Sequence, residues 1–326
     1  MIRHSPFFKL FPPPKFMMMT HAGLDISDDA LTCLQYETVG NELRVAFYGR
    51  QELPAGLLDG GDFKDEKEFT RILSEFVRRH RLSYVKVPLP EEKAYLFQTD
   101  MTSTDMRAAI QNIEFKLEEN VPLSAADAVF YIDPLPKAVT GGALRASVSV
   151  VPKTYVEKMI TLLSSIGLTP IAFEVAPKAI ARAVVALDSE ETMLILHAMN
   201  RKTGMYIVSG GAVHFSSTIG WGMRLDGTAP NEGSINPEPL AKEISRVNTY
   251  WMTRADTHSP LTRIICVGSD AALLRNALGK TDTGEIPLGN EADIWKNAFS
   301  IDRFVPTLSR DESLEYAVAA GLALPL

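Results

Sequence analysis

Two loops place acidic and hydroxyl side chains directly after a predicted buried strand, and these are the places where the sequence could do chemistry. Residues 23–29 read GLDISDD, and residues 267–273 read VGSDAAL. The familiar catalytic patterns H-E-x-x-H, G-x-S-x-G and G-x-G-x-x-G are absent. The six histidines show no ligand spacing, and the two cysteines, Cys33 and Cys266, lie far apart within apolar runs. Histidine-based metal chemistry and redox chemistry are therefore not predicted.

The composition is that of an ordinary globular protein. Of 326 residues, 46% are apolar and 22% are charged, with a formal net charge of −7. This length predicts two lobes or domains, because single cores stop growing at about 250 to 300 residues. The negative charge argues against general nucleic-acid binding, which needs a basic face. No apolar run approaches the roughly 20 residues of a membrane helix, and the separated cysteines favour a reducing cytoplasm.

The elements that must position the first loop are a strand meander and a helix. Three short apolar runs at 23–27, 30–37 and 43–49 predict antiparallel strands. Apolar residues at helical spacing predict a helix over 65–80, and a strand follows at 84–90. The first ninety residues therefore predict a sheet that is covered by a helix.

The pattern then repeats with variations. The expected strands are 94–99, 128–133, 143–151, 169–175, 192–198, 204–210, 212–220 and 263–269. The expected helices begin near residue 105 and at 155–166, 177–187, 239–251, 270–278 and 311–324. A meander followed by a helix thus appears twice, at residues 23 and 192, without sequence identity between the copies.

A duplicated meander with these two loops is the layout of actin-like ATPases, and within that class the sequence resembles the PilM family of type IV pilus assembly proteins. The resemblance rests on GLDISDDALTCLQYE, IEFKLEENVPLSAADAVFYID, GLTPIAFEVAPKAIARA and the ending YAVAAGLAL. It spans about residues 23 to 324. It implies an α/β, actin-like (ribonuclease H-like) two-lobed fold with an inserted SHS2-type subdomain, like that of the cell-division protein FtsA.

The resemblance also implies a division of the chain. The expected parts are a Phe- and Pro-rich leader (1–22), a first lobe (23–90), the inserted subdomain (91–172), a return helix and linker (173–190), and a second lobe with the C-terminal helix (191–326). The second lobe is expected to have a reduced roof subdomain, because only the loop at 222–239 occupies its place. The leader is expected to be a free tail or a docking strap.

The nucleotide pocket implied by the family departs from its pattern here. Asp25-Ile26-Ser27-Asp28 replaces Asp-Ile-Gly-Ser, His197-Ala198-Met199 replaces Asp-x-Gly, and Gly268-Ser269-Asp270 replaces Gly-Gly-Gly. Glycines let the backbone approach phosphates closely. An added carboxylate about 4 Å from a phosphate costs on the order of 4 kcal/mol at an effective dielectric of 20. We expect weak or lost ATP binding, with Asp25, Ser27, Gly268 and Ser269 as a vestigial pocket and Asp25 as its magnesium ligand.

The family further implies a partner, the N-terminal cytoplasmic peptide of a PilN-like membrane protein. The strands at 128–133 and 143–151 and the helix before them offer a surface for an extended peptide. The candidate contacts are Ile113, Leu117, Val129 and Tyr131, although the same residues would equally serve as the core of the subdomain.

The sequence therefore predicts a binding scaffold at the inner face of the cell membrane, as a monomer, a homo-oligomer or a ring, with membrane contact through its partner. Two alternatives remain. An active actin-like ATPase would need intact phosphate loops. An FtsA-like filament-forming membrane organiser would need an amphipathic anchor, and the C-terminal helix has no basic face.

Overall fold

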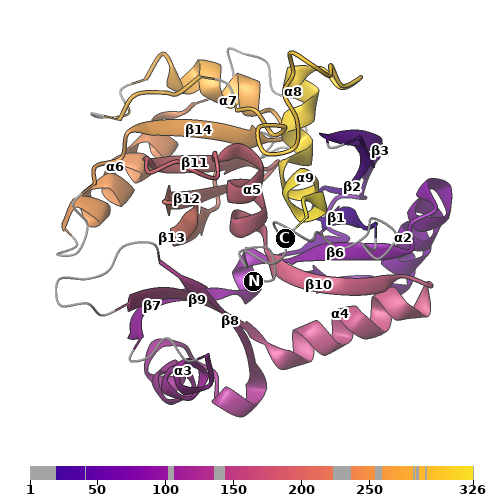
Figure 1. The fold of residues 1–326 in the computed structure, drawn as a ribbon, viewed down its shortest axis with the longest axis horizontal. Coiled ribbons are helices and arrows are strands. Elements are labelled where there is room, and N and C mark those ends of the chain that lie inside the picture. The colour runs from indigo at the N-terminus through magenta and orange to yellow at the C-terminus, as the bar shows by residue number, and fades with distance from the viewer. Residues whose placement is uncertain are drawn as a thin grey trace.

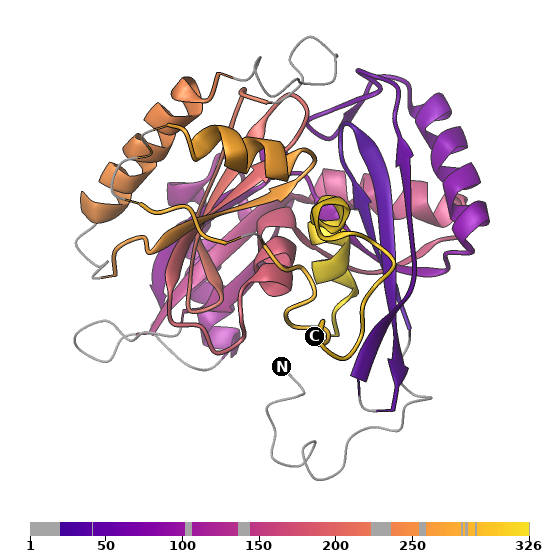
Figure 2. The same ribbon diagram turned by 90° about the horizontal axis from the view of Figure 1, so that it is seen from above.

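The computed structural model describes residues 20–40, 42–101, 106–135, 144–222, 236–253, 259–281, 283, 286–290 and 292–325. Residues 1–19 of the leader and most of the loop at 222–239 lie outside these residues. The described chain forms two lobes side by side and a third, smaller unit that lies below them in Figure 1 and behind them in Figure 2.

The first lobe is built on a five-stranded mixed sheet. The predicted meander β1–β2–β3 is antiparallel, and β6 and β10 continue the sheet in parallel with β1, in the order β10-β6-β1-β2-β3. The bounds are β1 Ala22–Ile26, β2 Ala30–Val39, β3 Glu42–Glu52, β6 Tyr84–Leu89 and β10 Thr169–Val175.

Helix α2 (Glu66–His80) covers one face of this sheet. It begins where the Asp65 side chain accepts a hydrogen bond from the Glu68 N–H, and it ends at Arg81 in a left-handed conformation. A short hairpin that the sequence pattern did not predict, β4 (Leu58–Asp59) and β5 (Asp62–Phe63), connects β3 to this helix. The predicted apolar face of α2 is buried: Phe69, Ile72, Leu73, Phe76 and Val77.

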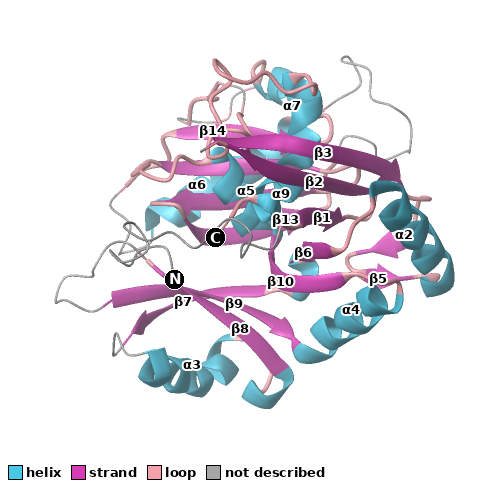
Figure 3. Ribbon diagram, turned by 45° about the vertical axis from the view of Figure 1, so that its right-hand side comes forward, coloured by secondary structure: helices cyan, strands magenta, loops and turns pink. Residues whose placement is uncertain are grey.

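The inserted subdomain is a three-stranded antiparallel sheet covered on one face by a helix (Figure 3). Its elements are β7 (Tyr95–Met101), α3 (Met106–Asn120), β8 (Ala128–Pro134) and β9 (Leu144–Pro152), and the strand order is β7-β9-β8. Ile113 and Leu117 of α3 pack against Val148 and Val150 of β9 in a core of their own. The strand β8 is an edge of this sheet.

The expected boundary of this subdomain at residue 172 is wrong by about twenty residues. After β9 comes α4 (Lys153–Ser165), whose Met159, Leu162 and Leu163 are buried in the core of the first lobe, and β10 then joins the sheet of that lobe. The helix α5 (Ala176–Val184) follows and ends three residues earlier than predicted. The subdomain with its own core thus ends at β9.

The second lobe repeats the plan with a four-stranded sheet in the order β13-β12-β11-β14. Its helices α6 and α7 flank that sheet, as predicted, in Figures 1 and 3. The bounds are β11 Thr192–Ala198, β12 Thr203–Ser209, β13 Ala212–Ile219, α6 Glu238–Thr253, β14 Arg263–Gly268 and α7 Ala271–Leu278.

The end of the chain differs from its prediction. The expected helix over 311–324 is divided into α8 (Arg310–Ser313), a 3-10 turn (Leu314–Tyr316) and α9 (Ala317–Ala323). Helix α9 packs on β1 and β2 of the first lobe and on α5, and its side chains share a hydrophobic core with those of the second lobe. A Cβ atom at Gly23 would lie 2.0 Å from the Ala319 carbonyl oxygen, so β1 and α9 approach closely because residue 23 has no side chain.

Candidate functional site

The cleft between the two lobes contains the first of the two loops. It is bounded by the β1–β2 turn, the β4–β5 hairpin, the β11–β12 turn, and the 3-10 turn η3 (Glu91–Lys93) that leads into the inserted subdomain. Its polar lining residues are Asp25, Ser27, Asp28, Glu91, Glu92, Tyr155, His197 and Lys202. Segments distant in sequence thus place acidic groups around a single ammonium group.

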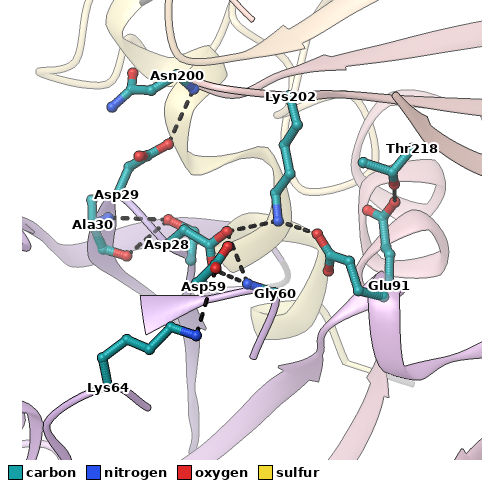
Figure 4. A network of polar contacts seen from close by, with 12 residues as sticks. Asp28, Asp29, Ala30, Asp59, Gly60, Lys64, Glu91, Asn200, Lys202 and Thr218 are labelled. Atoms are coloured by element: carbon teal, nitrogen blue, oxygen red, sulfur yellow. Dashed lines mark hydrogen bonds and ion pairs between the residues drawn. The ribbon is translucent and has the colours of Figure 1, made fainter. Parts of the chain in front are cut away.

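Lys202 of the second lobe reaches across this cleft. Its Nζ lies 2.7 Å from the Asp28 carboxylate of the first lobe and also forms an ion pair with Glu92 of η3 (Figure 4). The side chains of Asp28 and Lys202 are only 19% and 20% exposed. Burial alone would lower the pKa of Lys202, but the two carboxylates outweigh it and raise that pKa.

Backbone groups complete the closure of the cleft. The Gly60 N–H, in the turn of the β4–β5 hairpin, donates to both carboxylate oxygens of Asp28, at 3.0 and 3.2 Å. The Asn200 N–H of the second lobe donates to Asp29 at 3.1 Å. Asp28 and Asp29 therefore bind hydrogen-bond donors of the protein itself, at the place where the family resemblance predicts the phosphates of a nucleotide.

Two carboxyl groups in the cleft, the buried Asp25 and the half-buried Glu91, each have a raised pKa. Burial raises the pKa of Asp25 to about 7. The hydrogen bond from the Thr32 hydroxyl lowers this pKa, and the nearby charge of Glu91 raises it further. Burial also raises the pKa of Glu91 to about 7, although the hydroxyls of Tyr206 and Thr218 donate to it, the latter at 2.7 Å. Neutral pH therefore lies within the titration range of both groups.

His197 lies where the family pattern has an aspartate. It is half-buried, and its Nδ1 lies 3.3 Å from the Tyr206 hydroxyl. Burial, assisted by the charge of Lys202, lowers its pKa to about 4. A neutral imidazole therefore occupies this position at neutral pH.

The structure brings together only part of the predicted nucleotide pocket. Asp25 and Ser27 line the cleft, but Gly268 and Ser269 are not among its lining residues. The Ser27 hydroxyl donates to the Ala30 carbonyl at 3.0 Å and accepts from the Ala30 N–H at 3.1 Å, so it is engaged in its own turn. Gly268 has a φ of 95°, and a Cβ there would lie 2.2 Å from the Ala198 carbonyl oxygen, which accounts for the glycine without a ligand.

The cleft is also small. Its volume is about 50 Å³, whereas pockets for ligands of drug-like size measure roughly 300–1,000 Å³. Within the ranges that the structure describes, no three His, Cys, Asp or Glu side chains are grouped so as to hold a metal ion. The magnesium role of Asp25 stays a prediction.

A second and larger cavity lies where the inserted subdomain meets both lobes; we call it the junction groove. Its volume is about 240 Å³. Leu96 and Ser149 line it from the subdomain, Val175 and Pro177 from the first lobe, and Val213 from β13 of the second lobe. Its remaining lining residues are Glu91, Glu92, Ala94, Tyr95, Ser216, Ser217 and Thr218. Most of its wall is apolar or bears a small hydroxyl.

The four predicted partner contacts divide into two pairs. Ile113 and Leu117 are 1% and 0% exposed in the subdomain core, so the prediction that they contact a partner is corrected. Val129 and Tyr131 on the edge strand β8 are 43% and 58% exposed. The ring of Tyr131 lies under the Lys178 ammonium group of α5, at 3.7 Å from the ring centroid, and its partner role stays a prediction.

Comparison with solved structures identifies the fold. A chain of a PilM–PilN type IV pilus biogenesis complex is similar over 94% of this chain and 98% of its own length, with 18% identity and a TM-score of 0.73. The fold is actin-like. The sequence itself matches no family model and no curated protein.

Two further structures share this fold at a TM-score of 0.50. One is the cytoplasmic domain of EpsL, an inner membrane component of the type II secretion system of Vibrio cholerae, with 10% identity over 92% of this chain and 94% of its own. The other is the ethanolamine utilization protein EutJ from Carboxydothermus hydrogenoformans, with 12% identity over 96% of this chain and 90% of its own. At such low identity these similarities establish the fold alone.

The sequence pointed to only part of the polar lining of the cleft. Asp25, Ser27, Asp28 and His197 were singled out, but Glu91, Glu92 and Lys202 were not. No local pattern could identify these three, because they come from a turn between β6 and β7 and from the β11–β12 turn, over 100 residues apart.

In the described part of the chain, no helix is long and apolar enough to span a bilayer.

Proposed function

We propose that this protein is a scaffold of a type IV pilus or a related competence or secretion apparatus, and that it acts by binding rather than by catalysis. Its partner is the N-terminal cytoplasmic peptide of a PilN-like membrane protein. The observation that carries the proposal is the junction groove of about 240 Å³, formed by all three units of the fold. Two similar structures support the choice of partner: one is from a PilM–PilN type IV pilus biogenesis complex, and the other is the cytoplasmic domain of an inner membrane component of a secretion system.

The groove suits an extended peptide with apolar side chains. Leu96, Val175, Pro177 and Val213 provide apolar walls, and Ser149 adds a hydroxyl for a peptide group. Extended peptides bind such surfaces through main-chain hydrogen bonds to an edge strand and through side-chain pockets. We place the peptide in the junction groove, with the exposed Tyr131 on edge strand β8 as a further contact.

The cleft between the lobes supports a role without nucleotide turnover. Its acidic groups already bind Lys202, Gly60 and Asn200, and its volume of about 50 Å³ is far below that of a nucleotide pocket. Under this proposal the protein works at the inner face of the cell membrane and reaches the membrane through its partner. Assembly into a homo-oligomer or ring is compatible with this role.

Calorimetric titration with a synthetic peptide tests the proposal. The peptide is the N-terminal cytoplasmic segment of the short membrane protein encoded next to this one. The change Ser217→Arg places a long side chain in the groove from β13 and should weaken binding at least about tenfold, since a displaced anchor costs over 1 kcal/mol. Ser164→Arg, on the exposed face of α4, is the matched control. No heat at high micromolar peptide would contradict the proposal.

A further inference from the structure

The 3-10 turn η3 (Glu91–Lys93) forms a common wall between the cleft and the junction groove. Glu91 and Glu92 line both cavities. Ala94 and Tyr95, the two residues after the turn, line the groove only. A displacement of this turn therefore changes the shape of both cavities.

Both carboxylates of η3 are bound by the second lobe. Glu92 forms an ion pair with Lys202, and Glu91 accepts hydrogen bonds from Tyr206 on β12 and Thr218 on β13. Lys202 continues this connection to Asp28 in the first lobe. A single side chain thus joins the first lobe, the second lobe and the wall of the groove.

The charges in the cleft make this side chain essential to its closure. Asp25, Asp28, Glu91 and Glu92 line the cleft, and of the described lining residues only Lys202 is cationic. His197 faces the same space but is neutral at pH 7, because its pKa is lowered to about 4. Removal of one partner from a poorly exposed ion pair leaves uncompensated charge, which is far more costly than loss of a surface pair.

We propose that Lys202 is a positioning residue, whose ammonium group closes the two lobes in place of a bound nucleotide and holds η3 where the junction groove has its peptide-binding shape. The second half of this inference rests on the proposed function. Lys202 does not touch the peptide; it acts through Glu92. A protein with open lobes binds the peptide more weakly in proportion to the fraction that remains closed.

The test compares Lys202→Met, which keeps the length of the side chain and removes its charge, with Lys202→Arg, which keeps the charge. The first readout is amide hydrogen exchange in the β1–β2 and β11–β12 turns, without any peptide. We expect Lys202→Met to speed exchange at least about tenfold in both turns and Lys202→Arg to stay close to the wild type. Lys280→Met, on an exposed lysine after α7, is the control.

The second readout is the affinity of the same proteins for the peptide. We expect Lys202→Met to weaken binding about tenfold, with recovery in Lys202→Arg. Glu92→Gln, which weakens the ion pair but keeps a hydrogen-bonding group, should lower affinity in the same direction and gives a second variant if Lys202→Met folds poorly. Far-ultraviolet circular dichroism establishes that each variant is folded.

The outcomes separate the two proposals. Unchanged exchange in Lys202→Met would overturn the closure role, and faster exchange with unchanged affinity would overturn the coupling to the groove. If the wild-type protein binds no peptide, the proposed function fails and the coupling fails with it. The exchange experiment then still decides whether Lys202 closes the lobes.

Discussion

The cleft between the lobes and the junction groove are adjacent cavities that differ in chemistry and in occupancy. The cleft measures about 50 Å³, and its carboxylates are bound by an ammonium group and by backbone N–H groups of the same chain. The groove measures about 240 Å³ and is lined mainly by apolar and small hydroxyl side chains. The first cavity satisfies its own polar groups, whereas the second leaves apolar surface available. This difference is the reason that we propose the groove, and not the cleft, as the binding site.

Helix α9 packs on β1, the strand that leads into the cleft, and breaking that packing should have the largest effect. Gly23→Val would place a side chain within 2.0 Å of the Ala319 carbonyl oxygen. Because neither backbone segment can move without loss of core packing, we expect a loss of at least about 3 kcal/mol in the free energy of unfolding, or failure to fold. Urea denaturation measures this. The control is Gly220→Val, because residue 220 has open space around it. Gly56 also has open space, but its φ of 77° would strain any other residue.

The carboxyl groups of the cleft predict a pH dependence of stability. The pKa values of Asp25 and Glu91 are raised from 3.8 and 4.5 to about 7, so the folded state binds more protons than the unfolded state between about pH 4 and pH 7. Their contribution to stability is therefore fully present below about pH 4 and is lost as the pH rises to and through 7, by up to about 1.4 kcal/mol per pH unit and group. His197 has the opposite effect. Because its pKa is lowered to about 4, it makes the protein more stable as the pH rises from about 4 to about 6.5.

Denaturation at pH 6.5 and pH 8 isolates the carboxyl groups from the histidine. The wild type should lose stability over this interval. Asp25→Asn, which keeps the size of the side chain and removes its titration, should lose less. A wild-type protein that becomes more stable between these two pH values would contradict the assignment of protonated carboxyl groups to the cleft.

Removal of the Tyr206 hydroxyl should have an intermediate effect. Tyr206→Phe takes one donor from the half-buried Glu91 and leaves the aromatic packing in place. We expect the free energy of unfolding to fall by about 1–3 kcal/mol, the cost of a buried acceptor without its donor. Tyr84→Phe, at a tyrosine that is 42% exposed, should change it little. Equal effects of the two changes would argue against a special role for Glu91.

The smallest expected effect is at the edge of the groove. Tyr131→Ala removes an exposed ring and its contact with Lys178, so it should lower the melting temperature only slightly and weaken peptide binding by about 1 kcal/mol, or roughly fivefold. Phe115→Ala on α3 removes a ring that is 81% exposed and is distant from the groove lining, and it should weaken binding not at all. Equal affinities of the wild type and Tyr131→Ala would place the peptide away from β8.

The sequence predicted the fold well because its strands and helices have strong local patterns. The run 65–80 shows the apolar spacing of a helix, and GLDIS, ALTCLQYE and LRVAFYG alternate with turn residues, so these elements were predicted nearly to the residue. The place of an element in the fold, where tertiary contacts set it, was not predicted as well. α9 follows the second lobe in sequence but packs on β1, and α4 follows the subdomain but buries Met159 in the first lobe.

The candidate site was predicted less completely than the fold. Asp25 and Ser27 could be placed in the cleft, since they lie at the end of β1 and directly after it. The role of Ile113 and Leu117 in the core could not be separated from a role in binding, because both predict the same spacing on a helix. Lys202 carries no local signal; its importance arises only when three distant turns meet.

The most direct test of the central claim is a calorimetric titration of the peptide into the protein with and without magnesium ATP. The account predicts binding without nucleotide and an unchanged affinity when 1 mM ATP is added. We also predict that ATP alone gives no heat of binding with a dissociation constant below about 10 μM, which corresponds to a free energy near −7 kcal/mol. Peptide binding that requires ATP, or ATP binding below about 10 μM, would contradict it and favour an active ATPase.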